Sequence, residues 1–131
     1  MNQGLTTVQE FLKVSGTSLY TLTAGRIAKR KLPKNFKNEE AIIVINPPVE
    51  DTSEPTGSVM RGRYTFLCYG GTNSGEDAWD VFEALMSRLQ GITGNATSGG
   101  LVLAELETKS ETSDPDEGWP LVVAIFRIQT A

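Results

Sequence analysis

Few side chains in this chain could carry out chemistry. There is no histidine, so the commonest general base and transition-metal ligand is missing. The single cysteine, Cys68, could be a nucleophile, but it lies in an apolar strand pattern and has no histidine to activate it. A free cysteine in that context is usually a small buried hydrophobe. We therefore predict that the protein is not an enzyme and has no catalytic residue.

Two further segments could hold a ligand. The glycine-rich run from Tyr69 to Gly75 lies between a predicted strand and a predicted helix, which is the context of a phosphate cradle. It lacks both the glycine spacing of dinucleotide sites and the lysine of a P-loop. The acids of residues 105–117 do not follow the calcium-binding loop pattern. A strand-to-helix turn and a solvated loop are the favoured interpretations, and we expect no cofactor and no metal.

Charge is strongly segregated along the chain. With 12 basic and 16 acidic side chains the net charge is -4, which argues against a dedicated nucleic-acid-binding protein. Residues 26–37 contain six basic and no acidic side chains, whereas residues 105–117 contain six acidic side chains and one lysine. The basic run is either a solvated connector or a contact surface. The candidate assembly interface consists of Arg26, Lys29, Arg30, Lys31, Lys34, Lys37, Glu105, Glu107, Glu111, Asp114, Asp116 and Glu117.

The first half of the chain predicts one helix and two strands. Thr7 and Glu10 have the spacing of a capping box, which places a helix start at Thr7. Residues 41–45 read AIIVI, which is typical of a strand covered on both faces. In the strand predicted for residues 59–69, alternation places Tyr64, Phe66 and Cys68 toward the core.

The second half predicts one helix and a hairpin. Apolar residues recur at three- and four-residue spacing from Ala78 to Leu89, so this helix should lay one stripe on the sheet. Two strands follow, at residues 101–108 and 121–129, joined by an acidic turn. Trp119, at the start of the last strand, should pack across the hairpin.

The predicted fold class is α+β. We expect one mixed, mostly antiparallel four-stranded sheet with two helices on one face, in the order helix-strand-strand-helix-strand-strand. The whole chain, 1–131, should form a single domain. No apolar run approaches the ~20 residues that span a bilayer, so we expect no membrane association.

The order and local pattern of these segments resemble the tail terminator, or tail completion, proteins of long-tailed bacteriophages over about residues 20–129. The likeness rests on Gly25-Arg26-Ile27 leading to Leu32-Pro33, on strands 41–45 and 63–70, on helix 78–89, and on Asp114-Pro115-Asp116-Glu117-Gly118-Trp119-Pro120 before strand 122–128.

The resemblance implies a structural virion protein in the tail, at the neck, that assembles in the host cytoplasm. Members of the family form a hexameric ring on the head-proximal end of the tail tube, stop tube growth and present a head-joining surface. The implied partners are further copies of the chain, the tail tube protein and the neck proteins of the head connector. DNA would pass through the lumen without specific binding.

Opposite charges on two segments suit a ring, because one surface of each subunit there meets a different surface of the next. We hypothesise that the Arg26–Lys37 segment faces the Glu105–Glu117 loop of a neighbouring subunit or of the tube protein. Two alternatives stay open. The chain could be another neck component, such as a head-closure or connector adaptor protein, or a small ligand-binding module that uses the glycine turn.

Overall fold

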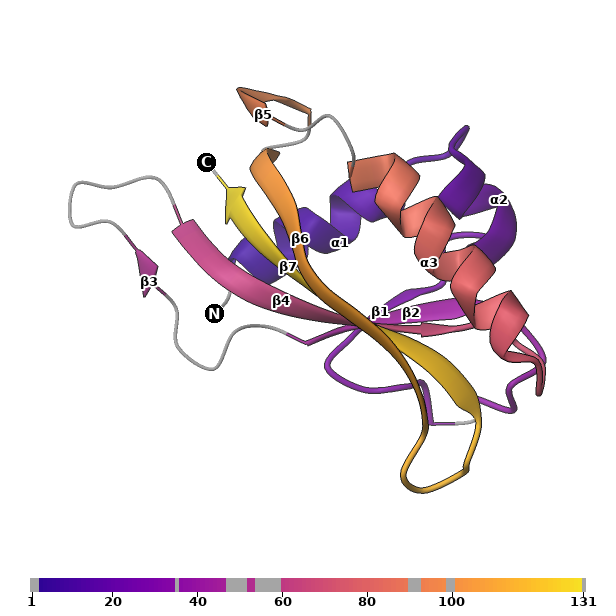
Figure 1. The fold of residues 1–131 in the computed structure, drawn as a ribbon. Helices are drawn as coiled ribbons and strands as arrows, with labels where there is room; N and C mark the ends of the chain where they lie inside the picture. The colour runs from indigo at the N-terminus through magenta and orange to yellow at the C-terminus, as the bar shows by residue number, and fades with distance from the viewer. Residues whose placement is uncertain are drawn as a thin grey trace.

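The computed structural model describes residues 3–34, 36–46, 52–53, 60–89, 93–98 and 101–130, which form three helices and one sheet (Figure 1). The helices are α1 (Gln3–Leu12), α2 (Ser18–Thr23) and α3 (Gly75–Leu89). The strands are β1 (Ile27–Lys29), β2 (Ile42–Asn46), β3 (Thr52–Ser53), β4 (Met60–Tyr69), β5 (Thr93–Ser98), β6 (Leu101–Ser113) and β7 (Pro120–Thr130).

The sheet has the strand order β1-β2-β4-β7-β6-β5, and β3 pairs with β4 beside this path. β1 and β2 are parallel, and every other described pair is antiparallel. β4, β6 and β7 are the longest strands and form its centre, with β7 paired along its length to both neighbours. The prediction of an α+β fold with a mixed, mostly antiparallel sheet is confirmed.

The predicted number of elements was wrong. The described residues contain seven strands and three helices, where the sequence predicted four strands and two helices. β1 and β3 are only three and two residues long, and the six-residue β5 (TGNATS) lacks apolar alternation. The six-residue α2 was missed because fewer than two turns give too little periodicity to detect.

The start of the first helix was also placed wrongly. Thr7 lies inside α1, which begins at Gln3, so Thr7 is not its N-cap. A threonine cap exists at the next helix instead, where Thr17 Oγ1 accepts a hydrogen bond of 3.1 Å from the backbone N–H of Tyr20. The capping-box pattern therefore identified the right region but the wrong boundary.

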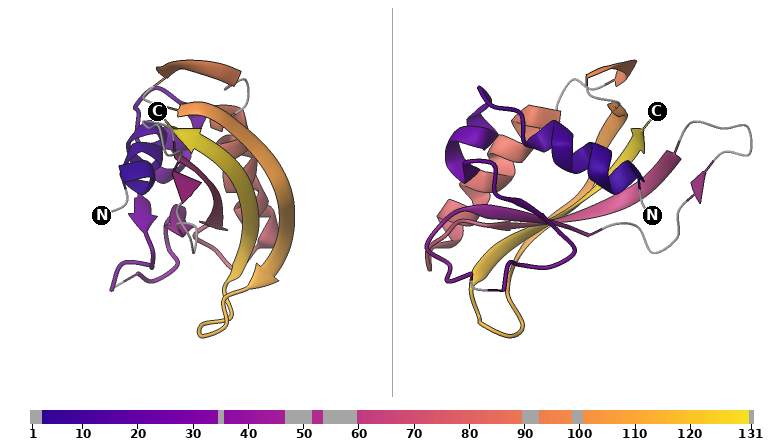
Figure 2. Two further views of the ribbon diagram at one scale, coloured as in Figure 1. Left: turned by 90° about the vertical axis from the view of Figure 1, so that its left-hand side faces the viewer. Right: turned by 180° about the vertical axis from the view of Figure 1, so that it is seen from behind.

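All three helices pack on one face of the sheet (Figure 2). Their buried residues form one cluster with the helix-facing strand residues, including Ile43, Phe66 and Phe126. Tyr64, Phe66 and Cys68 are buried in this cluster, whereas Arg63 is exposed, so the predicted alternation of β4 is confirmed. The apolar stripe of α3 faces the sheet as predicted; its buried members are Ala78, Val81, Phe82, Ala84, Leu85 and Leu89.

A smaller apolar cluster covers part of the opposite face. Ile42 and Val44 of β2 lie in it with Tyr69 and Leu121. Because Ile43 and Ile45 belong to the helix-side core, β2 is buried on both faces, as its continuous β-branched run predicted.

β1 forms one edge of the sheet, and hydrogen bonds within the chain occupy most of the backbone groups that point away from β2. The carbonyl of Ile27 accepts from Gln9 Nε2 at 2.7 Å, and the N–H of Ile27 donates to Gly25 at 2.9 Å. The carbonyl of Lys29 accepts from the N–H of Lys31 at 2.9 Å. An added strand would find few free partners at this edge.

Among the described residues, no helix is both long and apolar enough to cross a bilayer.

Candidate assembly surface

The basic segment begins where β1 ends. The backbone N–H of Arg30 donates a 2.8 Å bond to Ile45 of β2, and Arg30 has a positive φ of 74°, which turns the chain out of the sheet. The side chains of Lys29, Arg30 and Lys31 are exposed at this turn. Three consecutive cations therefore project from the end of the edge strand.

The remainder of the basic segment returns across the sheet face that carries no helix. Leu32 and Phe36 pack on the smaller apolar cluster, and Phe36 makes edge contacts with Tyr69 and Trp119, at ring-centroid distances of 6.0 and 5.4 Å. Asn38 donates a 2.9 Å bond to the carbonyl of Thr72. The segment is thus a packed connector with an apolar underside, and Trp119 packs against it.

The acidic turn is held from within by Asp114. Its Oδ1 accepts hydrogen bonds of 2.9 Å from the backbone N–H groups of Asp116 and Glu117, and its Oδ2 accepts one of 2.8 Å from the hydroxyl of Tyr69. Partial burial acts to raise the pKa of Asp114, but these hydrogen bonds outweigh it and hold the pKa below its ordinary value. Asp114 therefore shapes the turn, while the side chains of Asp116 and Glu117 remain exposed.

Two other acids of the predicted interface are also engaged within the chain. Glu107 accepts from Arg63 at 2.6 Å and from Arg127 at 3.3 Å, across three adjacent strands. Glu111 accepts from the indole N–H of Trp79 on α3. Their carboxylates point to different faces of β6, so they do not form one patch with the turn.

The twelve predicted interface residues thus divide into two groups. Arg26, Glu107, Glu111 and Asp114 have partners in their own chain. The remaining side chains are exposed and have no ion pair among the described residues: Lys29, Arg30, Lys31, Lys34, Lys37, Glu105, Asp116 and Glu117. The Phe36–Trp119 contact brings the basic connector and the base of the acidic turn of one chain to the same end of the sheet.

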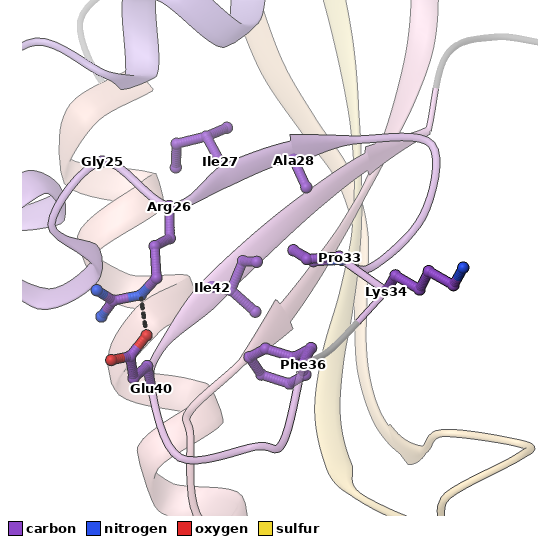
Figure 3. A pocket seen from close by; sticks show the side chains of 9 residues that line it. All are labelled: Gly25, Arg26, Ile27, Ala28, Pro33, Lys34, Phe36, Glu40 and Ile42. Atoms are coloured by element: carbon purple, nitrogen blue, oxygen red, sulfur yellow. Dashed lines mark ion pairs between the residues drawn. The ribbon is translucent and has the colours of Figure 1, made fainter.

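A pocket of about 490 Å³ lies between β1, the start of β2 and the connector (Figure 3). Its wall is mostly apolar, and the polar side chains lie at opposite ends of the view, with Arg26 paired to Glu40 at 3.5 Å on one side and Lys34 on the other. The lining residues are Gly25, Arg26, Ile27, Ala28, Pro33, Lys34, Phe36, Glu40 and Ile42. This pocket was not predicted from the sequence, although an isolated Phe36 within a basic run was a usable signal of it.

The glycine turn has a packing role. A methyl group on Gly70 would lie 2.5 Å from the backbone nitrogen of Ala78, at the start of α3. A methyl group on Gly71, whose φ is +82°, would lie 2.5 Å from the backbone carbon of Glu40. The glycines thus allow α3 and the connector to approach the end of β4 closely. This close packing accounts for glycine at both positions without a bound phosphate.

Cys68 is fully buried in the helix-side core, and this burial raises the pKa of its thiol. A buried thiol held neutral is a poor nucleophile. Within the part of the chain that the structure describes, no three histidine, cysteine or acidic side chains lie close enough together to hold a metal ion.

The comparison with solved structures finds a similar fold in a gene transfer agent particle. A chain of the virion of the native gene transfer agent (GTA) particle superposes with a TM-score of 0.61 and 14% sequence identity, covering 94% of this chain and 90% of that chain. At 14% sequence identity, this similarity shows only that the two chains share a fold. No family model and no curated protein matches the sequence.

Proposed function

We propose that this chain is a structural virion protein that forms a ring, with the hexameric stoichiometry of tail terminators, on the head-proximal end of a phage tail tube. In that role it stops tube growth, provides the surface for head joining and acts without catalysis. The observation that carries the proposal is the fold likeness to a chain of the gene transfer agent virion, which extends over 94% of this chain.

The distribution of charge supports an assembly role. Exposed cations and exposed acids occupy separate segments, and none of them forms an ion pair with another residue that the structure describes. Unpaired charges of both signs on one subunit favour a heterologous contact, and in a closed ring such contacts repeat between every pair of neighbours. A net charge of -4 per subunit would also disfavour tight binding of the DNA that passes through the ring.

Electron microscopy of particles made without this protein tests the proposal directly. Loss of a terminator should give overlong tails, because nothing then stops polymerisation of the tube. Restoring the protein should return the tails to a uniform length. Tails of normal length in its absence would refute the terminator role.

The same images separate the proposal from its nearest alternative. A head-closure or connector adaptor protein would leave tails of normal length that fail to join heads. The glycine-turn ligand module is less well supported, because Gly70 and Gly71 are closed in by backbone atoms of Ala78 and Glu40.

A further inference from the structure

We propose that the pocket beside β1 receives the β6–β7 turn of a second copy of this chain, so that Glu117 and Asp116 of one subunit meet Lys34 of the next. This inference rests on the proposed function, because it names the contact that would build the ring. The sequence suggested contact between two whole charged segments, whereas the contact proposed here joins one pocket to one turn.

The pocket has the chemistry to receive an acidic turn with an apolar side chain. Ile27, Ile42 and Phe36 form much of its wall, and Ala28 and Phe36 keep part of their surface accessible to solvent. Covering such a surface removes apolar area from water. An occupant therefore needs a small apolar group to enter the pocket and polar groups to remain at its rim.

The charge at the rim is uneven. Arg26 donates a 2.9 Å hydrogen bond to the carbonyl of Ala41 and pairs with Glu40, so its charge is partly satisfied. Lys34 pairs with none of the residues that the structure describes, and it extends outward from the opposite side of the pocket (Figure 3). Exposed Lys31 and Lys37 flank it in sequence. The uncompensated charge is thus positive and selects an anionic occupant.

The β6–β7 turn has the complementary features. Asp116 and Glu117 present two exposed carboxylates, and the adjacent Pro115 is an exposed apolar group with little conformational freedom. Backbone bonds of 2.8 Å from the N–H of Gly118 to the carbonyl of Asp114, and from the N–H of Asp114 to the carbonyl of Trp119, fix the turn. A turn that is already ordered loses little conformational entropy when it binds.

The placement of the turn favours a second copy as the source. In Figures 1 and 2 the turn projects beyond the end of the sheet, where a neighbouring subunit can reach it. Its base is fixed in its own chain by Tyr69 and by the contact of Trp119 with Phe36. Because the turn and the pocket are different surfaces, the contact repeats from subunit to subunit, as a ring requires.

Charge reversal with rescue tests the contact. Lys34→Glu and Glu117→Lys should each raise the dissociation constant for self-association about tenfold at low salt, measured by sedimentation velocity up to millimolar concentration. The double variant, with both changes in one chain, should return it close to the wild-type value. Lys13→Glu is the matched control, because it makes the same charge change on an exposed lysine just after α1 and should have little effect.

Several results would overturn the contact. Wild-type protein that stays monomeric at every concentration, single variants that associate normally, or a double variant that is not rescued would each do so. Duplex DNA that binds wild type and not Lys34→Glu would assign the cations to nucleic acid instead. If one of these results is found and tails made without the protein are nevertheless overlong, the terminator role is supported and the subunits must use a different interface. Tails of normal length would refute the terminator role whether or not the copies associate.

Discussion

The hydroxyl of Tyr69, the last residue of β4, donates a hydrogen bond of 2.8 Å to Oδ2 of Asp114, which precedes the β6–β7 turn. The two residues are 45 positions apart in the sequence. The bond therefore ties the tip of the long hairpin to a central strand, at the end of the sheet where the basic connector also packs. The shape of the acidic turn depends on this connection.

We expect a pH-dependent loss of stability from Asp114. Its folded-state pKa is lowered, so its contribution is complete above the unfolded pKa of about 3.9 and is lost as the pH falls through the folded value. At pH 7, Asp114→Asn should lower the free energy of unfolding by about 1.5 kcal/mol. The difference from wild type should close on acidification toward about pH 2, measured by urea unfolding. The Asp116 side chain has no hydrogen bond or ion pair with the described residues, so Asp116→Asn should show no such trend. A difference between Asp114→Asn and wild type that grew on acidification would contradict the role assigned to Asp114.

Gly71 and Gly118 provide a matched pair of glycines. Both have positive φ, of 82° and 74°, so alanine is strained at either position. A methyl group on Gly118 meets no atom within 4 Å, whereas one on Gly71 meets the backbone of Glu40. We expect Gly118→Ala to cost about 1 kcal/mol of stability and Gly71→Ala at least about 3 kcal/mol. Equal losses in thermal denaturation would show that backbone strain alone matters.

Arg88 should stabilise the packing of α1 against α3. Its Nε and Nη2 donate hydrogen bonds of 3.1 and 3.0 Å to the carbonyl of Phe11, and its guanidinium lies 3.6 Å from the centre of the Phe11 ring. Arg88→Met should lower the free energy of unfolding by about 1 to 3 kcal/mol, and Arg88→Lys should recover only part of it, because an ammonium lacks the planar fork. Glu83→Gln, on the exposed face of α3, is the control. Full recovery with lysine would show that charge alone suffices.

Cys68 should be unreactive in the folded protein. It is fully buried, and its pKa is raised by burial, so both access and thiolate formation are suppressed. Iodoacetamide at pH 8 should modify it at least about a hundredfold more slowly in native protein than in urea, because reaction requires unfolding. Mass spectrometry follows the adduct. Rapid labelling of the native protein would mean that the strand opens locally.

The sequence by itself determined the principal elements and the side chains that face the core. Continuous β-branched residues in β2, two-residue alternation in β4 and the three- and four-residue spacing in α3 each reflect local geometry, so they could be predicted without knowledge of the neighbouring elements. The same information located the charged segments and the acidic turn. It could not detect β1 and β3, which have only three and two residues, α2, which completes fewer than two turns, or β5, which lacks apolar alternation.

Only the tertiary structure decided which charges remain available for a partner. Glu107 of β6 can reach Arg63 of β4 because only β7 lies between these two strands in the sheet. Arg26 lies next to Glu40 because each comes just before one of two neighbouring parallel strands, β1 and β2. Such pairings depend on strand order and register, which arise from contacts distant in sequence. Phe36 likewise lines a pocket because the connector packs back over β2, a contact that the sequence pattern does not reveal. Composition and spacing identified the charged segments, and packing divided them into structural and exposed residues.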